Sequence, residues 1–344
     1  MQLLTTLRAV RRVMRLYRAN LAPRAGLQVL RHLRKKIAGL SPIPTVFLSV
    51  TYRCQARCPH CYAVAEGRDA AAELTTAEWR LVLERVRAAG ALQTFFTGGE
   101  PLLREDLPDL VAHAHRQGLL TRVFTNGYLL TPKVIARLKR AGLTQCCVSI
   151  DDADPDAHDR LRGLPGSFAR AVEALARLRE EGIDRRILVY ASHDKIPAGL
   201  ERLIALGASL GVASVHINIP FAVGRWDAND AVVLSAAEME SLRALVRRHP
   251  RVTIEFPQPD TSCCGLAGKI ACVNTRGEVL LCAAVPFPIG FLAEESFDEI
   301  WGRHPRTSGP QWRGSCPLNC AEGRSLLEEQ ARMLRAGRRI IRPR

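Results

Sequence analysis

The stretch Val46-Phe-Leu-Ser-Val-Thr-Tyr-Arg-Cys54-Gln-Ala-Arg-Cys58-Pro-His-Cys61 joins a short apolar run to a loop that carries three cysteines. Residues 46–50 are apolar or β-branched, which predicts a buried strand. The C-x3-C-x2-C spacing differs from the paired C-x2-C knuckles of zinc ribbons. Three thiolates that hold a four-iron cluster leave one iron open to bind a ligand. A zinc ion bound by the three thiolates and His60 is the alternative.

Around this stretch, a strand-like run, a turn and a helix-like run recur six times between residues 43 and 250. Capping boxes at Thr75–Glu78 and Ser235–Glu238, and Pro132 at a first helical position, mark helix starts. The alternation predicts parallel strands joined by right-handed crossovers. We therefore expect an α/β fold, a partial (β/α)6 TIM-like barrel, with its chemistry on the loops that follow the strands. The expected strands are 46–50, 93–97, 119–124, 145–150, 186–191 and 214–219.

Polar residues and glycines stand where three of these strands end. They are Gly98, Gly99 and Glu100 after the second strand, Thr125 and Asn126 after the third, and Ser149 and Asp151 at the end of the fourth. Paired glycines let the backbone come close to a ligand, and a carboxylate beside them can accept a hydrogen bond from an ammonium group. The alternation of a strand places Ser149 and Asp151 on the same side.

The cysteine loop, followed along the chain by the motif that ends at Glu100, resembles the radical S-adenosylmethionine (radical SAM) superfamily. The resemblance implies a [4Fe-4S] cluster whose open iron chelates SAM, and a 5′-deoxyadenosyl radical that abstracts a substrate hydrogen. It implies that the cluster ligands are Cys54, Cys58 and Cys61. It implies SAM contacts from His60, in the position set against adenine, from Gly98, Gly99, Glu100, Thr125 and Asn126, and from Ser149 and Asp151 facing the ribose. The stretch from Pro220 to Gly224 and Arg225 is similar to one in many relatives.

Six more cysteines lie beyond residue 250, where the strand–helix pattern stops and Cys, Gly and Pro become frequent. Their spacing around Gly277, and the stretch Ser296–Trp301, resemble the SPASM or shorter twitch extensions of radical SAM enzymes. The resemblance implies one auxiliary [4Fe-4S] cluster, because two fully ligated clusters would need about eight thiolates. A structural zinc held by the same residues is the alternative. The implied ligands are Cys264, Cys282, Cys316 and Cys320.

These two sets of implied ligands leave four of the eleven cysteines without a metal. Cys263 and Cys272 are candidates for chemistry, because in some relatives a cysteine returns a hydrogen atom to the substrate radical; an inert or ligating role is the alternative. Cys146 and Cys147 lie inside the fourth strand and are expected in the core. Arg162, four residues after a histidine, is expected either near SAM or paired with a carboxylate.

The formal net charge of +15 comes from the two ends of the chain. Residues 1–42 carry ten basic side chains and residues 332–344 carry six, and neither segment has an acidic one. Apolar residues from Leu3 to Leu21 predict a basic amphipathic helix, and a second is expected around residues 27–37 after a break at 20–26. Such helices lie on an anionic membrane surface, contact RNA, or pack on the barrel. Nucleic acid is the least favoured, since the ends lack an RNA-recognition pattern.

Together these patterns predict four parts: a basic helical segment (1–42), a radical SAM barrel (43–250), an auxiliary-cluster domain (251–325) and a basic tail (326–344). The absence of an apolar leader or span predicts a reducing cytoplasm, with peripheral contact at the inner face of the membrane through the basic ends. The expected partners are a peptide or small-molecule substrate and a reductant such as flavodoxin or ferredoxin. A non-catalytic iron–sulfur or zinc protein and an RNA-modifying radical SAM enzyme are the alternatives.

Overall fold

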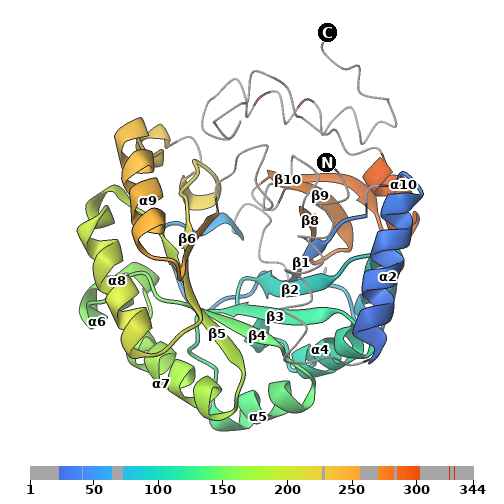
Figure 1. Ribbon diagram of the computed structural model, residues 1–344, viewed down its shortest axis with the longest axis horizontal. Coiled ribbons are helices and arrows are strands. Elements are labelled where there is room, and N and C mark those ends of the chain that lie inside the picture. The colour runs from blue at the N-terminus through green and yellow to red at the C-terminus, as the bar shows by residue number, and fades with distance from the viewer. Residues whose placement is uncertain are drawn as a thin grey trace.

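Ten strands form one curved sheet with helices around its outer side (Figure 1). The computed structural model describes residues 23–40, 42–63, 73–226, 229–255, 270–282 and 285–302, with Ser325 and Glu329. The strands pair in the order β10-β9-β8-β1-β2-β3-β4-β5-β6-β7. All pairs from β8 to β7 are parallel, whereas β9 pairs antiparallel with β8 and with β10.

The strands are β1 (Thr45–Thr51), β2 (Gln93–Gly98), β3 (Leu120–Thr125), β4 (Gln145–Ser149), β5 (Asp184–Tyr190), β6 (Ser214–Asn218), β7 (Val252–Glu255), β8 (Ile270–Val273), β9 (Glu278–Cys282) and β10 (Val285–Phe291). The α-helices are α2 (Pro23–Ile37), α3 (Thr76–Ala88), α4 (Leu107–Arg116), α5 (Pro132–Arg140), α6 (Pro155–Arg162), α7 (Ser167–Glu180), α8 (Ala198–Ser209), α9 (Ala236–Arg248) and α10 (Phe297–Gly302).

The six predicted strands are all present, and their ends differ from the prediction by at most two residues. The parallel sheet also continues past residue 250, because β7 pairs with β6 and β8 pairs with β1. Both added strands have four residues, too few to produce a periodic pattern. The β8–β9 hairpin turns at Gly277, whose φ of 81° is in the left-handed region.

Local capping signals begin the helices as predicted. Thr75 with Glu78, and Ser235 with Glu238, form complete capping boxes at the starts of α3 and α9. Pro132 occupies the first position of α5. These contacts satisfy backbone N–H groups that have no partner inside the helix, so each helix starts where the sequence indicates.

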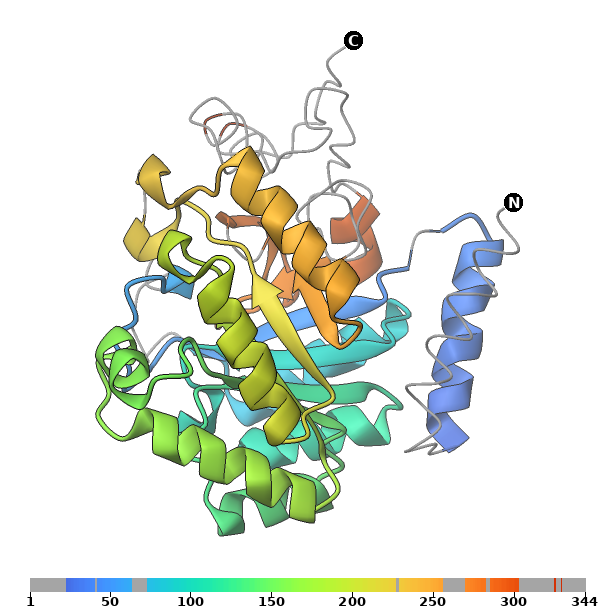
Figure 2. The same cartoon turned by 60° about the vertical axis from the view of Figure 1, so that its left-hand side comes forward.

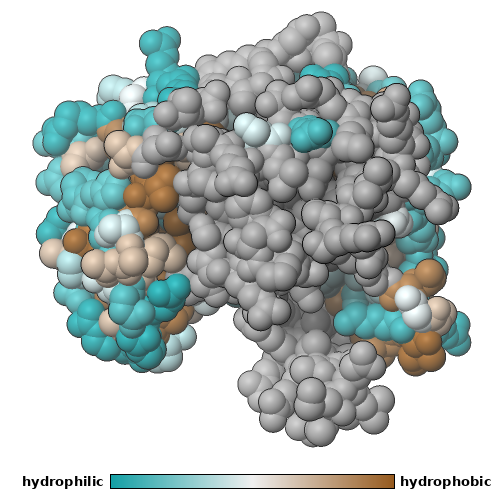
Figure 3. Space-filling model, turned by 90° about the horizontal axis from the view of Figure 1, so that it is seen from above, coloured by the Kyte–Doolittle hydropathy of each residue, from teal (hydrophilic) through white to brown (hydrophobic). Residues whose placement is uncertain are grey.

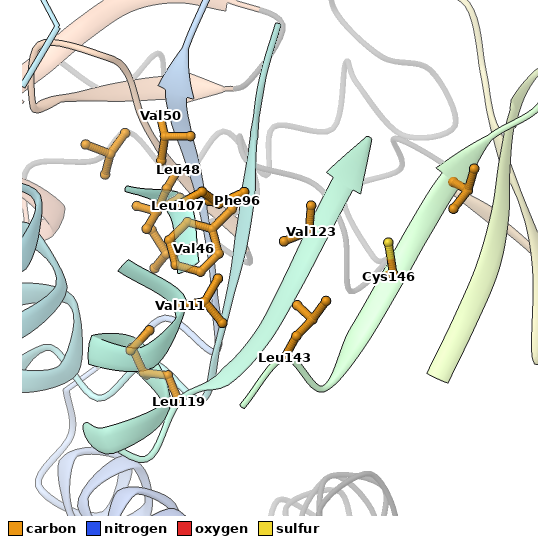
Figure 4. Close-up of a cluster of buried hydrophobic side chains, with 14 of the residues drawn as sticks. Val46, Leu48, Val50, Phe96, Leu107, Val111, Leu119, Val123, Leu143 and Cys146 are labelled. Carbon is orange, nitrogen blue, oxygen red and sulfur yellow. The ribbon is translucent and has the colours of Figure 1, made fainter. Parts of the chain in front are cut away.

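The core lies between the sheet and the outer helices. Val46, Leu48 and Val50 point from β1 toward α4, and Phe96 of β2 joins them (Figure 4). Their alternate neighbours, such as Phe47, face the inside of the barrel. The sheet therefore has an apolar outer face that holds the helices and an inner face that is left for the site.

Helix α2 docks on the barrel through polar side chains. The Gln28 amide donates to the carbonyl oxygens of Arg87 in the last turn of α3 (2.8 Å) and of Ala91 between α3 and β2 (2.7 Å). His32 Nδ1 donates to the Gly90 carbonyl oxygen (2.8 Å). Packing on the barrel, one of three alternatives for the basic segment, therefore holds for α2.

The predicted break at residues 20–26 was wrong for its last part, because α2 begins at Pro23 and runs through Gly26. Proline at this first helical position needs no N–H partner, so it starts the helix rather than interrupting it. Residues 1–22 and the basic tail lie outside the described residues, apart from Ser325 and Glu329.

The outer face of α2 carries exposed apolar side chains among its basic ones. Leu27, Leu30 and Ile37 are 66%, 44% and 86% exposed. Figure 2 shows α2 at the side of the barrel, and hydrophobic surface appears on the same side in Figure 3. In the part of the chain that the structure describes, no helix has both the length and the apolar character needed to cross a membrane.

We predict that Gln28→Ala lowers the free energy of unfolding by about 1–3 kcal/mol, because it removes the amide that donates to the buried Ala91 carbonyl oxygen. Alanine has the higher helix propensity, so the loss cannot come from the helix itself. Leu27→Ala, one residue away and exposed, is the matched control and should change stability by less than about 0.5 kcal/mol. Urea unfolding followed by circular dichroism measures both. Equal losses in the two variants would contradict the docking role of Gln28.

Candidate active site

Three cysteines lie in the loop that follows the carboxyl end of β1. Cys58 is buried, and Cys54 and Cys61 are partly exposed. The Cys61 N–H donates to the Cys58 carbonyl oxygen (3.3 Å), which closes a turn between them. Burial raises the pKa of Cys54 to about 11, and the nearby thiols of Cys58 and Cys61 add to the effect. The three thiols are therefore close enough to interact electrostatically.

The geometry of the cysteine loop distinguishes an iron–sulfur cluster from a single metal ion. Within the described ranges, no three His, Cys, Asp or Glu side chains converge closely enough to hold one ion. His60, the fourth ligand of the zinc alternative, instead has Nε2 3.6 Å from Asp151 Oδ2. A four-iron cluster takes its thiolates at the corners of a cube rather than at a point. The loop fits the cluster better than it fits zinc.

The two glycines at the end of β2 lie against the start of this loop. A Cβ on Gly98 would lie 2.0 Å from the Thr51 carbonyl oxygen, and one on Gly99 would lie 2.3 Å from that of Arg53. The Gly99 and Glu100 N–H groups donate to these same oxygens at 2.7 and 2.8 Å. The two glycines therefore allow the chain's own backbone to approach, in addition to the ligand approach that the sequence suggested.

The Glu100 carboxylate is fully buried and holds three donors. Oε1 accepts from the Thr125 hydroxyl (2.8 Å) and the Leu102 N–H (3.2 Å), and Oε2 accepts from the Asn126 N–H (2.8 Å). Burial raises the pKa of Glu100 to about 7, against the opposing effect of these hydrogen bonds. The structure thus brings together Glu100, Thr125 and Asn126, whose contacts with SAM stay predictions. Gln55 of the cysteine loop reaches the same group by donating to Asn126 Oδ1 (3.4 Å).

The Asp151 carboxylate is the centre of a buried charge network. Arg162 Nη2 lies 2.6 Å from Asp151 Oδ2, and the Tyr190 N–H donates to Oδ1 (3.2 Å). The Asp151 N–H donates to His158 Nδ1 (3.1 Å). Burial alone would raise the pKa of Asp151, but Arg162 and the neighbouring His60 and Lys195 hold it well below its usual range. Of the two roles expected for Arg162, the structure shows pairing with a carboxylate.

His60 lies in an aromatic group at the mouth of the barrel. Its ring centroid is 4.5 Å from that of Tyr190 and 5.8 Å from that of Trp226. Burial lowers the pKa of His60 to about 4, so the imidazole is neutral near pH 7. The His60 ring is tilted by 33° from that of Tyr190 and by 57° from that of Trp226, so the three rings enclose a small aromatic corner.

Ser149 ends β4 on the inner face of the barrel, two residues before Asp151. The ribose contacts expected of Ser149 and Asp151 stay predictions. The sequence analysis missed Lys195, which is 6% exposed at the end of the 3-10 helix His193–Lys195 and acts on the pKa of both Asp151 and His60. It belongs to no motif, so only the path of the chain after β5 reveals it.

Unsatisfied polar atoms indicate where a polar ligand would fit. Asn126 Nδ2, His158 Nε2 and Arg162 Nε are buried and have no hydrogen-bond partner. Buried polar atoms are normally paired, so groups left unpaired beside the cysteine loop suit a ligand with several acceptors. The residues around the loop therefore fit SAM beside a cluster.

The remaining cysteines fall in different places. Cys146 lies in the core between sheet and helices, as predicted, and Cys147 is buried on the opposite face of β4. Cys272 is buried in β8, where it packs with Phe47 and lies opposite Leu280. Cys282 ends β9 and is partly exposed. The other four, Cys263, Cys264, Cys316 and Cys320, lie outside the described residues.

Comparison with known families and proteins shows what this chain is similar to. A profile of the radical SAM superfamily matches residues 48–198. The chain is 31% identical over 309 residues to the PqqA peptide cyclase of Xanthomonas axonopodis pv. citri, which covers 82% of this chain and 81% of that protein. It is 32% identical over 193 residues to the AdoMet-dependent heme synthase of Nitratidesulfovibrio vulgaris, covering 56% of this chain and 52% of that protein.

Solved structures share the fold. Streptococcus suis SuiB bound to its precursor peptide SuiA matches with a TM-score of 0.65 at 15% identity, over 84% of this chain and 75% of that one. The structure of anSMEcpe with bound AdoMet and the Cp18Cys peptide matches with a TM-score of 0.62 at 14% identity, over 86% of this chain and 97% of that one.

We predict that Gly224→Ala prevents the cysteine loop from holding iron. Gly224 has φ of 66°, and a Cβ there would lie 2.3 Å from the Cys61 carbonyl oxygen, so the loop would have to move. Gly166→Ala is the matched control, because Gly166 has φ of 75° but open space around its Cβ position. After anaerobic reconstitution, the EPR signal that changes on SAM addition should fall several-fold in Gly224→Ala and stay near wild type in Gly166→Ala. Equal losses would mean that backbone strain alone, and not contact with the loop, matters.

Proposed function

Since the chain belongs to the radical SAM superfamily and is a radical SAM enzyme, we propose that its substrate is a peptide. The similarity to PqqA peptide cyclases carries this proposal, because it extends over 82% of the chain and so well beyond residues 48–198, the part matched to the superfamily as a whole. The heme synthase relative covers 56% of the chain. A small-molecule substrate is therefore the second candidate.

At the carboxyl end of the sheet, different residues would bind different parts of the cofactors. Cys54, Cys58 and Cys61 would hold the cluster, and the Glu100 carboxylate, fixed by its three donors, would accept a hydrogen bond from the amino group of SAM. His60 would offer its ring to the base. When bound, the cluster and SAM supply the radical that abstracts hydrogen from the substrate. The protein contributes positioning and exclusion of water.

The inner face of the barrel would receive the substrate. The rings of Phe47 and Phe95 stack with centroids 4.5 Å apart, and Phe124 meets Phe95 edge-on at 4.9 Å. The Arg122 guanidinium lies 4.9 Å from the centroid of Phe95. An interior with both ring faces and a cation suits a ligand that has apolar side chains and carbonyl groups, as a peptide does.

The region beyond β7 would hold an auxiliary [4Fe-4S] cluster through Cys264, Cys282, Cys316 and Cys320. Two features support this part of the proposal. Gly277 makes the turn that leads β9 to Cys282. The Ser296 hydroxyl and Glu299 form a capped start to α10, whose Trp301 is buried. Cys272 stays a proposed hydrogen-atom donor, since it faces the inside of the barrel beside Phe47.

Two further parts of the proposal concern location and electron supply. The exposed leucines of α2 stand beside exposed Arg34 and Lys36. Apolar and basic groups on one surface favour peripheral contact with an anionic membrane. A low-potential donor such as flavodoxin or ferredoxin would supply the electron for SAM cleavage.

We predict that the chain, reconstituted anaerobically with iron and sulfide and given dithionite and SAM, forms 5′-deoxyadenosine. Cys58→Ala should reduce the product at least about 100-fold, to the level without enzyme, because it removes a cluster ligand. Cys146→Ala, a buried core cysteine, is the control and should retain turnover. Liquid chromatography with mass detection measures the nucleoside. Wild-type protein that holds an intact cluster but forms no product would support the non-catalytic alternative.

We predict that the hydrogen donor is a peptide, which a labelled extract can test. Cells of the organism that encodes the chain are grown in deuterated medium, and their extract is divided into two halves. One half is treated with a protease, and the protease is then inhibited. Deuterium should appear in 5′-deoxyadenosine with the untreated half and fall several-fold after proteolysis. Transfer that survives proteolysis would instead favour the small-molecule candidate, while transfer lost after ribonuclease would favour RNA.

A further inference from the structure

One guanidinium joins the cysteine loop to the buried carboxylate. Arg162 Nη1 lies 3.6 Å from Cys58 Sγ, in hydrogen-bonding position, while Nη2 lies 2.6 Å from Asp151 Oδ2. The Arg162 carbonyl oxygen also accepts from the Arg57 N–H (2.8 Å), so its main chain contacts the same loop. Arg162 is the last residue of α6 and is 7% exposed.

We propose that Arg162 is a positioning residue that sets the reduction potential of the cluster held by Cys54, Cys58 and Cys61. A hydrogen bond from a cation to a thiolate ligand stabilises the more negative, reduced cluster, and hydrogen bonds to the sulfurs are among the factors that tune such potentials. The step concerned is the transfer of one electron from an external reductant to the cluster. Arg162 itself takes up no electron and no proton in this step.

Burial makes the effect large enough to matter. A solvated arginine would be screened by water and salt, whereas this one is enclosed and its second nitrogen is fixed by Asp151. Asp151 itself offsets part of the positive charge, but it contacts Nη2, which leaves Nη1 to approach Cys58 Sγ. Asp151 therefore orients the donor, and Arg162 presents its N–H to the thiolate.

A second arginine supplies a matched control. Arg225 Nη1 donates to the Arg57 carbonyl oxygen (2.8 Å), so it supports the same loop through the backbone rather than through a thiol. If support of the loop were all that mattered, loss of either side chain would alter the cluster in the same way. If the N–H to sulfur contact matters, the two losses will differ.

The test is an EPR-monitored redox titration of the reconstituted full chain without SAM, with the signal of this cluster identified in parallel samples by its response to SAM. In Arg162→Gln, the ratio of reduced to oxidised cluster at a fixed potential should fall about tenfold, which is a shift of about 59 mV for one electron. Arg162→Lys, which keeps the charge but not the planar fork, should fall between. Arg225→Gln should titrate as the wild type does. An unchanged midpoint in Arg162→Gln, or an equal shift in Arg225→Gln, would overturn the proposal.

A measurement on the wild-type protein covers the case in which Arg162→Gln does not assemble a cluster. Protein labelled with ¹⁵N in the arginine side chains should show a hyperfine coupling between guanidinium nitrogen and the reduced cluster. Absence of any such coupling would overturn the proposal without a variant. Because the proposal depends on superfamily membership and not on the peptide substrate, it can fail while the substrate assignment stands, and the reverse also holds.

Discussion

The buried carboxylate of Asp151 is the interaction on which the rest of the site depends. An ionised group removed from water is costly unless charges and hydrogen bonds compensate it. The compensation comes from parts of the chain that are far apart: Arg162 at the end of α6, the Tyr190 N–H in β5 and Lys195 after β5. Because Arg162 also contacts Cys58 and the Arg57 N–H, this network fixes the loop relative to β4, β5 and α6. The site is as much a consequence of one desolvated charge as of the cysteines.

Close backbone contact is the second constraint. Gly98, Gly99 and Gly224 each stand where a Cβ would meet the backbone of residues 51–62 at less than 3 Å. Gly98 ends β2, Gly99 follows it and Gly224 follows β6, so the loop is enclosed from two sides of the barrel. Hydrogen bonds from Gly99 and Glu100 then attach it to the sheet. A loop held this way keeps its thiols in place before any metal arrives, which reduces the ordering needed on binding.

The sequence predicted the six central strands because each is flanked by turn residues and followed by a helix-like run. It did not predict β7 and β8, since four residues carry no period, and they are recognised as strands only by pairing with β6 and β1. The start of α2 was misplaced for a related reason. Its inward face is mixed, with Gln28 and His32 buried together with Ala25 while Leu27 is exposed, so an apolar pattern alone does not mark the buried side.

The sequence by itself determined the order of the motifs: the three cysteines after β1, Glu100 after β2, Asn126 after β3 and Asp151 after β4. Parallel strands bring such positions to one edge, so their meeting follows from periodicity alone. Only the tertiary structure decided what each side chain contacts. Whether Arg162 reaches a carboxylate, a thiol or both depends on where α6 ends relative to the loop, and that position is set by packing and by the cost of leaving Asp151 unpaired.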